Sequence, residues 1–169
     1  AQATTPATLQ ETLSQAQAAL AAGDYQAAYT SFELLETTFA REPEVQARSF
    51  RLVVLPLHAY AALLAGEPQK AIERFESFLR EFPDDRSRTP FVLFNLARAH
   101  QEMGANAKAI EAYRRFVALD PDRPEAALAT LAAADLMFNS ARAEEGFETL
   151  DALIARDPPA IIRNKARLT

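Results

Sequence analysis

Apolar residues recur along this chain with the 3.6-residue period of an α-helix, and the clearest example runs from Pro90 to Pro121. Two successive segments each place their apolar residues on one face: Leu93, Leu96, Ala97 and Met103 in the first, and Ala109, Ile110, Tyr113, Phe116 and Val117 in the second. Gly104 separates the segments, since glycine readily adopts the left-handed backbone that ends a helix. Pro121 stops the second segment. The pattern predicts two short helices folded against each other.

The same pattern of turn, small residue, large residues and proline recurs four times. The turn positions are Gly23, Gly66, Gly104 and Ala141, and the closing prolines are Pro43, Pro83, Pro121 and Pro158. A small residue and two large ones follow each turn: Ala28, Phe32 and Leu35; Ala71, Phe75 and Phe78; Ala109, Tyr113 and Phe116; Gly146, Leu150 and Leu153. Such recurrence is typical of a repeat protein, in which each unit buries its apolar face against the next.

This pattern resembles the tetratricopeptide repeat (TPR) over residues 9–158. The turns lie 43, 38 and 37 residues apart, more than the usual ~34, and the chain has no tryptophan. The resemblance implies an all-α fold: a right-handed superhelix, or α-solenoid, of antiparallel TPR helix pairs. We expect a disordered segment 1–7 and one domain 8–169, with repeats at 9–43, 44–83, 89–121 and 124–158. Residues 159–169 would form a capping helix or begin a fifth repeat.

Local signals predict several helix ends. Thr8, with Glu11 three residues later, matches a capping box, and Asp24 is a suitable N-cap for the next helix. One long helix is predicted from Glu44 to Ala65. A kink is expected near Leu52–Pro56, because a proline inside a helix removes a backbone hydrogen bond.

Composition narrows the function. The 169 residues include no cysteine, which excludes disulfides and thiolate metal sites. No run of 18 apolar residues predicts a membrane span, and a net charge of −5 argues against nucleic acid as a partner. The opening residues 1–6 resemble the new end left by signal-peptide cleavage, although a trimmed chain would look similar. We therefore favour an exported or periplasmic location over a cytoplasmic one.

Candidate catalytic chemistry is sparse. The two histidines, His58 and His100, occupy inward-facing positions on different helices. Neither has a second histidine or a Glu-Xaa-Xaa-His pairing within one helical turn, which gives a metal site little support. Phosphate loops and nucleophile elbows are missing as well. We expect packed structural histidines, no cofactor, no metal and no enzymatic activity, with a ligand or catalytic base as the alternative role.

Recognition is then expected on the first helix of each pair, because these helices line the concave surface in TPR proteins. The resemblance selects Leu13, Gln17 and Leu20 in the first pair and Leu64, Leu128 and Leu131 further along. The principal candidates for partner binding are Tyr60, Leu63, Phe91, Phe94, Asn95, Arg98, Gln101, Asp135 and Phe138. Aromatic side chains with an arginine are typical of interaction hot spots. Some of this set is expected to pack between repeats instead.

The leading hypothesis is a non-catalytic scaffold that binds a peptide, helix or domain of a partner protein in this groove. The segments Ala71–Phe75 and Phe78–Pro83 resemble the second helix of periplasmic repeat proteins in envelope assembly. Those proteins include lipoproteins of the outer-membrane β-barrel assembly machinery and the cell-division coordinator of the Tol-Pal system. The alternative is a regulatory or substrate-recruiting TPR segment of a larger, enzymatic protein. Self-association through the terminal helices stays open.

Overall fold

The computed structural model describes residues 8–156 together with Ile162, Lys165 and Ala166. In this part of the chain the regular structure is helical throughout and contains no strand, which confirms the predicted all-α class. The chain divides into two compact units, Ala1–Pro83 and Asp84–Thr169, where the sequence predicts a single domain. The predicted disordered segment 1–7 and most of the predicted cap 159–169 lie outside the described residues.

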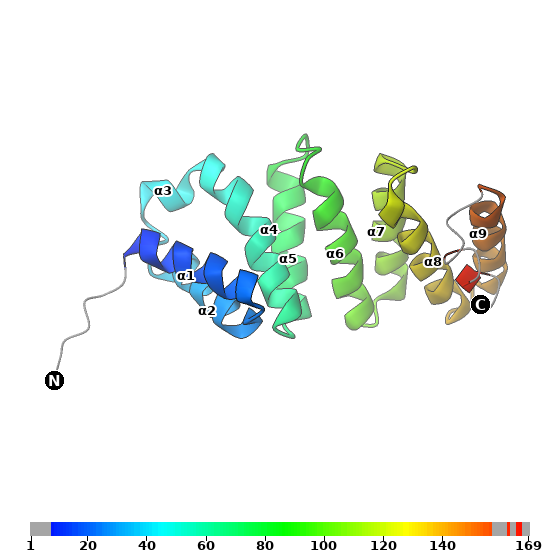
Figure 1. Cartoon of the computed structure of the whole chain (residues 1–169), viewed down its shortest axis with the longest axis horizontal. Coiled ribbons are helices and arrows are strands. Elements are labelled where there is room, and N and C mark those ends of the chain that lie inside the picture. Colours follow the sequence, from blue (N-terminus) through cyan, green and yellow to red (C-terminus); the bar gives the residue numbers. More distant parts are fainter. Residues whose placement is uncertain (1–7, 157–161, 163–164, 167–169) are drawn as a thin grey trace. The chain divides into compact units, whose positions relative to one another are not determined.

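The first unit contains two of the predicted helix pairs. Its helices are α1 (Leu9–Ala22), α2 (Tyr25–Thr37), α3 (Pro43–Gln46), α4 (Arg48–Leu64) and α5 (Pro68–Glu81) (Figure 1). Helix α1 packs on α2, α4 packs on α5, and α2 also packs on α4. Both predicted N-terminal caps are present. Thr8 and Glu11 form the capping box, and Asp24 accepts a hydrogen bond of 3.1 Å from the backbone N–H of Ala27.

The prediction of one helix from Glu44 to Ala65 is wrong, because the helical backbone is interrupted at Ala47 and two helices form instead. The backbone of Ala47 is extended, with φ −62° and ψ 134°, and the helix that follows continues through the buried Pro56. Helix α3 is instead held by the segment before it. Val45 is buried, and the Gln46 side chain donates a hydrogen bond of 3.0 Å to the carbonyl of Ala40.

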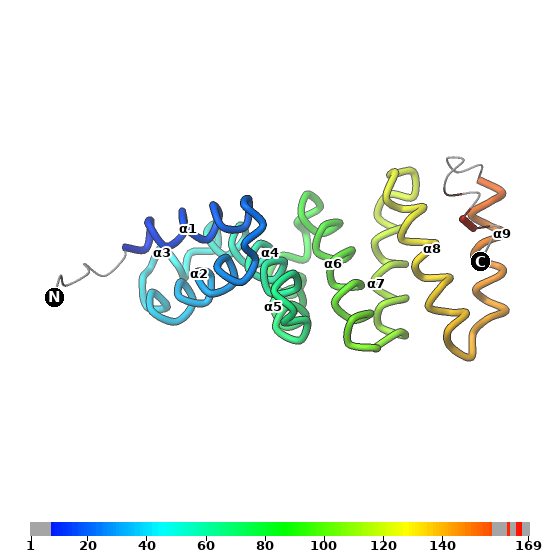
Figure 2. The backbone as a smooth tube through the Cα atoms, turned by 60° about the horizontal axis from the view of Figure 1, so that its bottom comes forward, coloured from blue at the N-terminus to red at the C-terminus, as the bar shows by residue number. Residues whose placement is uncertain are grey.

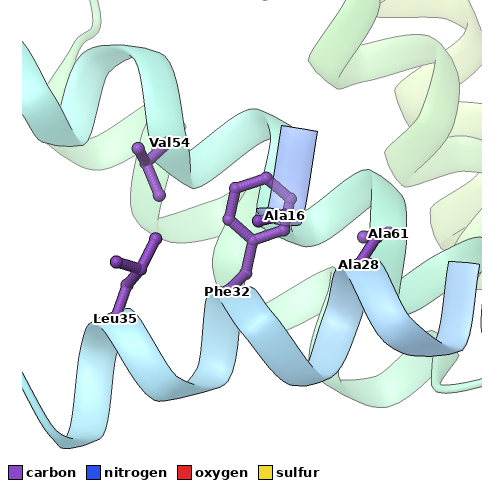
Figure 3. Close-up of a cluster of buried hydrophobic side chains, with 6 residues drawn as sticks. All are labelled: Ala16, Ala28, Phe32, Leu35, Val54 and Ala61. Atoms are coloured by element: carbon purple, nitrogen blue, oxygen red, sulfur yellow. The ribbon is translucent and has the colours of Figure 1, made fainter. Parts of the chain in front are cut away.

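The core of this unit follows the repeat pattern read from the sequence. Six buried side chains from α1, α2 and α4 form a cluster: Ala16, Ala28, Phe32, Leu35, Val54 and Ala61. Figure 3 shows the Phe32 ring extending from α2 toward Ala16, and Leu35 and Val54 pointing toward each other. Three members, Ala28, Phe32 and Leu35, are the predicted small and large positions. Their complete burial confirms the predicted register of α2.

The second unit contains α6 (Thr89–Glu102), α7 (Asn106–Leu119), α8 (Pro124–Phe138) and α9 (Ala143–Ala155), and each helix packs on the next along the chain (Figure 2). The predicted small and large positions are buried again: Ala109, Tyr113 and Phe116 in α7, and Gly146, Leu150 and Leu153 in α9. Ile162 and Ala166 are helical and buried, and Ala166 packs with Leu150. Ala166 therefore packs on the fourth pair.

The predicted turn glycines adopt the left-handed conformation. Gly23, Gly66 and Gly104 have φ values of 79°, 82° and 69°. In each turn the residue after the glycine donates its N–H to the carbonyl five residues earlier, which satisfies a carbonyl at the helix end. The fourth pair lacks a turn glycine and has Gly146 within α9 instead. A Cβ atom there would lie 3.0 Å from the Phe138 ring, so this glycine makes room for Phe138.

A buried polar network joins the two helix pairs of the first unit. His58 on α4 is fully buried, and its ring centroid lies 5.6 Å from that of Phe32. Arg74 on α5 donates a hydrogen bond of 3.0 Å to His58 Nδ1 and forms ion pairs with Glu33 and Glu36 of α2. Both carboxylates also face the ring, with Glu36 Oε1 3.1 Å from Nδ1 and Glu33 Oε1 3.6 Å from Nε2.

This network sets the charge state of Glu36. Burial alone would raise the pKa of Glu36, but the contact with His58 and the positive charges of Arg74 and Arg51 together hold that pKa below its usual 4.5. A carboxyl group whose pKa is lowered by folding stabilises the folded state while it is ionised. The network therefore contributes to the packing of α2 on α4 and α5 at neutral pH.

The repeat register predicts which core residues matter most. Phe75 is 0% exposed and Tyr113 is 3% exposed, whereas Arg86 lies exposed in the loop before α6. Phe75→Ala and Tyr113→Ala should each lower the free energy of unfolding by roughly 3–5 kcal/mol, because each leaves a cavity. Arg86→Ala should change it by about 0.5 kcal/mol or less. Urea denaturation followed by circular dichroism measures all three, and equal effects would contradict the register.

The Glu36 network predicts a pH-dependent stability. Glu36→Gln should lower the free energy of unfolding by about 1–3 kcal/mol at pH 7, because a hydrogen-bonded charge is lost. The difference from wild type should shrink as the pH falls below about 4.5, where protonation removes the same contribution from wild type. Denaturation curves between pH 3 and about 7 measure this trend. Glu73→Gln, at an exposed carboxyl of α5, is the control and should give a small difference at every pH.

Candidate functional site

The buried polar side chains among the described residues are Thr12, His58, Asn95 and His100. The part of the chain that the structure describes contains no group of three or more His, Cys, Asp or Glu side chains placed to hold a metal ion. His58 lies within the Arg74 network, and His100 is 5% exposed on α6. No helix among the described residues is long and apolar enough to cross a membrane. The exposed faces of the helices offer candidate binding surfaces.

The first unit has an apolar cavity on its first-helix face. Its volume is about 310 Å³, and it is lined by α1 on one side and by α3, Ala47 and α4 on the other. The lining residues are Leu13, Gln17, Glu44, Ala47, Ser49, Phe50, Val53 and Val54. Val53 is 40% exposed although it is fully apolar. Two residues of the predicted first-helix face, Leu13 and Gln17, lie in this cavity.

The interruption at Ala47 helps to form this cavity, since Glu44 and Ala47 are part of its wall. The sequence places Phe50 and Val53 on the apolar face of a helix but does not reveal the wall, because it predicts a continuous helix there. The other predicted residues of the unit lie further along α4. Leu63 is 2% exposed and Tyr60 is half-buried, and a role of either in partner binding stays a prediction.

On α6 the predicted residues separate into surface and interior. Phe91 is 38% exposed and Arg98 is half-buried. Asn95 is 4% exposed, and its Nδ2 donates a hydrogen bond of 2.9 Å to the carbonyl of Phe91. Its Oδ1 accepts one of 3.2 Å from Arg98. Asn95 therefore lies beneath the predicted surface and positions Arg98, and its role in partner binding stays a prediction.

Phe94 packs within its own helix pair. Its ring centroid lies 5.8 Å from that of Tyr113 and 5.3 Å from that of Phe116, both in edge-to-face geometry. The Phe94 side chain is half-buried, so much of its ring is occupied by contacts within the helix pair. Gln101 is exposed, and its Oε1 accepts a hydrogen bond of 3.2 Å from the Tyr113 hydroxyl.

The end of α8 carries a second aromatic contact. Asp135 and Phe138 are both half-buried, and the Phe138 ring meets the Phe147 ring of α9 at 4.8 Å in edge-to-face geometry. Phe147 is 58% exposed. The sequence prediction omits Phe147 because that prediction covers first helices only. The signal that could have found it is a large aromatic residue next to Gly146, in a helix rich in acidic residues.

The structure brings some predicted residues together and separates others. Asn95 contacts Phe91 and Arg98, and both Phe94 and Gln101 contact Tyr113. Tyr60 belongs to the unit Ala1–Pro83, whereas Phe94 and Phe138 belong to Asp84–Thr169. A single face that includes all three aromatic residues therefore stays a prediction.

Solved structures similar to this chain include TPR proteins. A TPR protein from Parabacteroides merdae is 18% identical with a TM-score of 0.68, and the alignment covers 95% of this chain and 56% of that one. MamA from Desulfovibrio magneticus is 17% identical with a TM-score of 0.67, covering 88% and 75%. Nearly identical TPR-like repeats from Podosopora anserina give 20% identity and a TM-score of 0.67, covering 87% and 74%. These likenesses confirm the predicted TPR fold.

The sequence comparison extends from fold to family. No curated protein matches the chain significantly. A family profile described as "YfiO: Outer membrane lipoprotein" matches residues 6–162, which is most of the chain. This family is consistent with the predicted kinship to repeat proteins of the bacterial envelope. The chain, built of TPR helix pairs, therefore belongs to the YfiO family of outer membrane lipoproteins.

Proposed function

We propose that this protein is a non-catalytic scaffold that binds a segment of a partner protein on the first-helix faces of its TPR pairs. The TPR fold and the family support a role in protein interaction. The observation that carries the proposal is the cavity between α1 and α4. Its walls include Leu13, Phe50 and Val53, and a volume of about 310 Å³ is left unfilled. Covering this apolar surface would be favourable by about 25 cal/mol per Å².

The shape and polarity of the cavity favour one kind of partner. Apolar walls favour apolar side chains, while Gln17 and Glu44 supply polar groups in the same lining. A helix or an extended segment that inserts one or two apolar side chains meets both conditions. In the second unit, Phe91, Leu128 and Arg98 offer a similar combination on first helices, with exposed fractions of 38% and 47% for the two apolar residues.

The same proposal includes a location in the cell envelope. The family is described as an outer membrane lipoprotein, which supports an exported or periplasmic protein. Fractionation of the source cells by osmotic shock, with an antibody against the untagged protein, tests the location. Recovery with cytosolic markers alone would contradict it.

The experiment on binding starts by capturing the partner. A photo-reactive phenylalanine derivative is placed at Val53 or Phe91, and at Leu119 as a control on a second helix, where Leu119 is 48% exposed. Irradiation of whole cells should give a discrete cross-linked product from the first two positions and none from the third. A product from Leu119 alone would assign binding to the opposite face.

A matched pair of variants then measures the contribution of the cavity. Val53→Glu should weaken binding of the captured partner by about 2 kcal/mol, as expected for a hot spot, with unchanged helical content. Leu34→Glu, on α2 of the same unit, is the control because Leu34 is 45% exposed against 40% for Val53. Isothermal titration of the purified partner measures both. Equal losses, or a loss with Leu34→Glu only, would contradict the proposed surface.

A further inference from the structure

Phe147 on α9 is exposed at a repeat position that the other pairs bury fully or in part. The equivalent residues, counted from each turn, are Tyr29, Ile72 and Ile110. Tyr29 is half-buried, Ile72 is 7% exposed and Ile110 is 1% exposed, whereas Phe147 is 58% exposed. In the first unit, the first helix of the next pair covers this position, since the Tyr29 ring meets His58 of α4 at 5.6 Å. A helix is thus the natural cover for this position.

The exposed ring is fixed by its surroundings. Phe138 holds it in edge-to-face contact at 4.8 Å, and Gly146 provides the space for Phe138, because a Cβ atom there would lie 3.0 Å from that ring. The other pairs have alanine at the position of Gly146. A side chain held in one orientation loses little conformational freedom when a partner covers it. Phe147 is therefore a preorganised apolar contact.

Acidic side chains lie on one side of Phe147 along the exposed face of α9. Glu144, Glu148 and Asp151 are exposed. Glu144 and Asp151 lie three residues before and four residues after Phe147, so they are its neighbours on the helix surface, and Glu148 is a neighbour of both carboxylates at the same spacings. Within the described residues, no ion pair neutralises any of these three carboxylates. Glu145 differs, since hydrogen bonds from Arg142 and Arg114 lower its pKa to about 2 and pair its charge. Among the described residues, the face thus combines one apolar ring with three carboxylates that form no ion pair.

We propose that this α9 face, formed by Phe147, Glu144, Glu148 and Asp151, docks an amphipathic helix of a partner protein with basic residues beside an apolar ridge. Charge complementarity selects the basic partner, and the repeat geometry selects a helix. A second copy of this chain is a poorer occupant. A symmetric contact would place the same acidic residues of both copies against each other. The α9 face is separate from the first-helix faces proposed above, because it belongs to a second helix.

Two synthetic helical peptides test the proposal. One has a leucine ridge flanked by lysines, and the other has the same ridge flanked by glutamates. Both are labelled with fluorescein and titrated with the whole chain in about 0.1 M salt, while anisotropy is measured. The lysine peptide should bind at least about tenfold more tightly than the glutamate peptide. Equal affinities for the two peptides would overturn the proposal, because contact would then not depend on the carboxylates.

Variants of the chain assign the binding to the α9 face. Phe147→Ala should weaken the lysine peptide at least about tenfold, while Phe147→Leu should keep most of the affinity. Glu148→Lys combined with Asp151→Lys should also weaken it at least about tenfold. The control pair, Glu102→Lys with Glu111→Lys, makes the same change in net charge at exposed residues of the same unit and should change affinity less than about twofold. Equal losses from the two charge pairs would mean non-specific attraction and overturn the proposal.

Further outcomes separate this proposal from its alternatives. Circular dichroism checks that each variant folds. If Phe147→Ala does not fold, the comparison of the two charge-reversal pairs tests the proposal. Light scattering that shows a wild-type dimer and a Phe147→Ala monomer would identify a second copy as the occupant and overturn the proposal. Val53→Glu should leave peptide binding unchanged, so that failure of the α9 face and failure of the first-helix cavity remain distinguishable.

Discussion

Each helix pair in this protein depends on a very small residue, alanine or glycine, at the point where the second helix packs against its neighbours. Ala28, Ala71 and Ala109 are completely buried at this position, and the fourth pair has Gly146. Close approach of the helices there brings the large residues, such as Phe32 and Phe75, into full burial. A larger side chain would separate the helices and open voids along the whole pair, since protein interiors are packed to high density. The register of the core therefore follows from one small residue per pair.

This constraint explains why so much of the fold can be predicted from sequence. Small residues, large residues and left-handed glycines recur at fixed intervals, and local backbone preferences at Gly23, Gly66 and Gly104 agree with the tertiary packing. The interruption at Ala47 has no such signal. Alanine is a good helix former, and the extended backbone there lies next to the buried Val45 and to Gln46, whose side chain bonds the carbonyl of Ala40. The division of the chain into two compact units after Pro83 likewise depends on tertiary contacts and has no local sequence signal.

The candidate surface is less predictable, because exposure depends on what lies opposite each side chain. Helical period correctly places Asn95 and Leu63 on first helices, but both are buried. Asn95 turns back to bond the carbonyl of Phe91, an interaction that its residue type permits but does not require. Phe94 rests on Tyr113 and Phe116 across the pair. Sequence periodicity thus identifies a face, and only the packing shows which of its members reach solvent.

Helix α3 is separated from α4 by the extended Ala47, and this separation affects how the cavity wall can vary among related proteins. Helix α3 forms part of the cavity wall, while the core register of α4 is fixed by buried residues such as Val54 and Ala61. The extended Ala47 lies between the two. Insertions or deletions between Phe39 and Ala47 would reshape the wall without shifting any residue of α4 relative to its partners, because loop length is constrained only weakly. Relatives could therefore diversify their ligands at this segment while they keep an identical helical core.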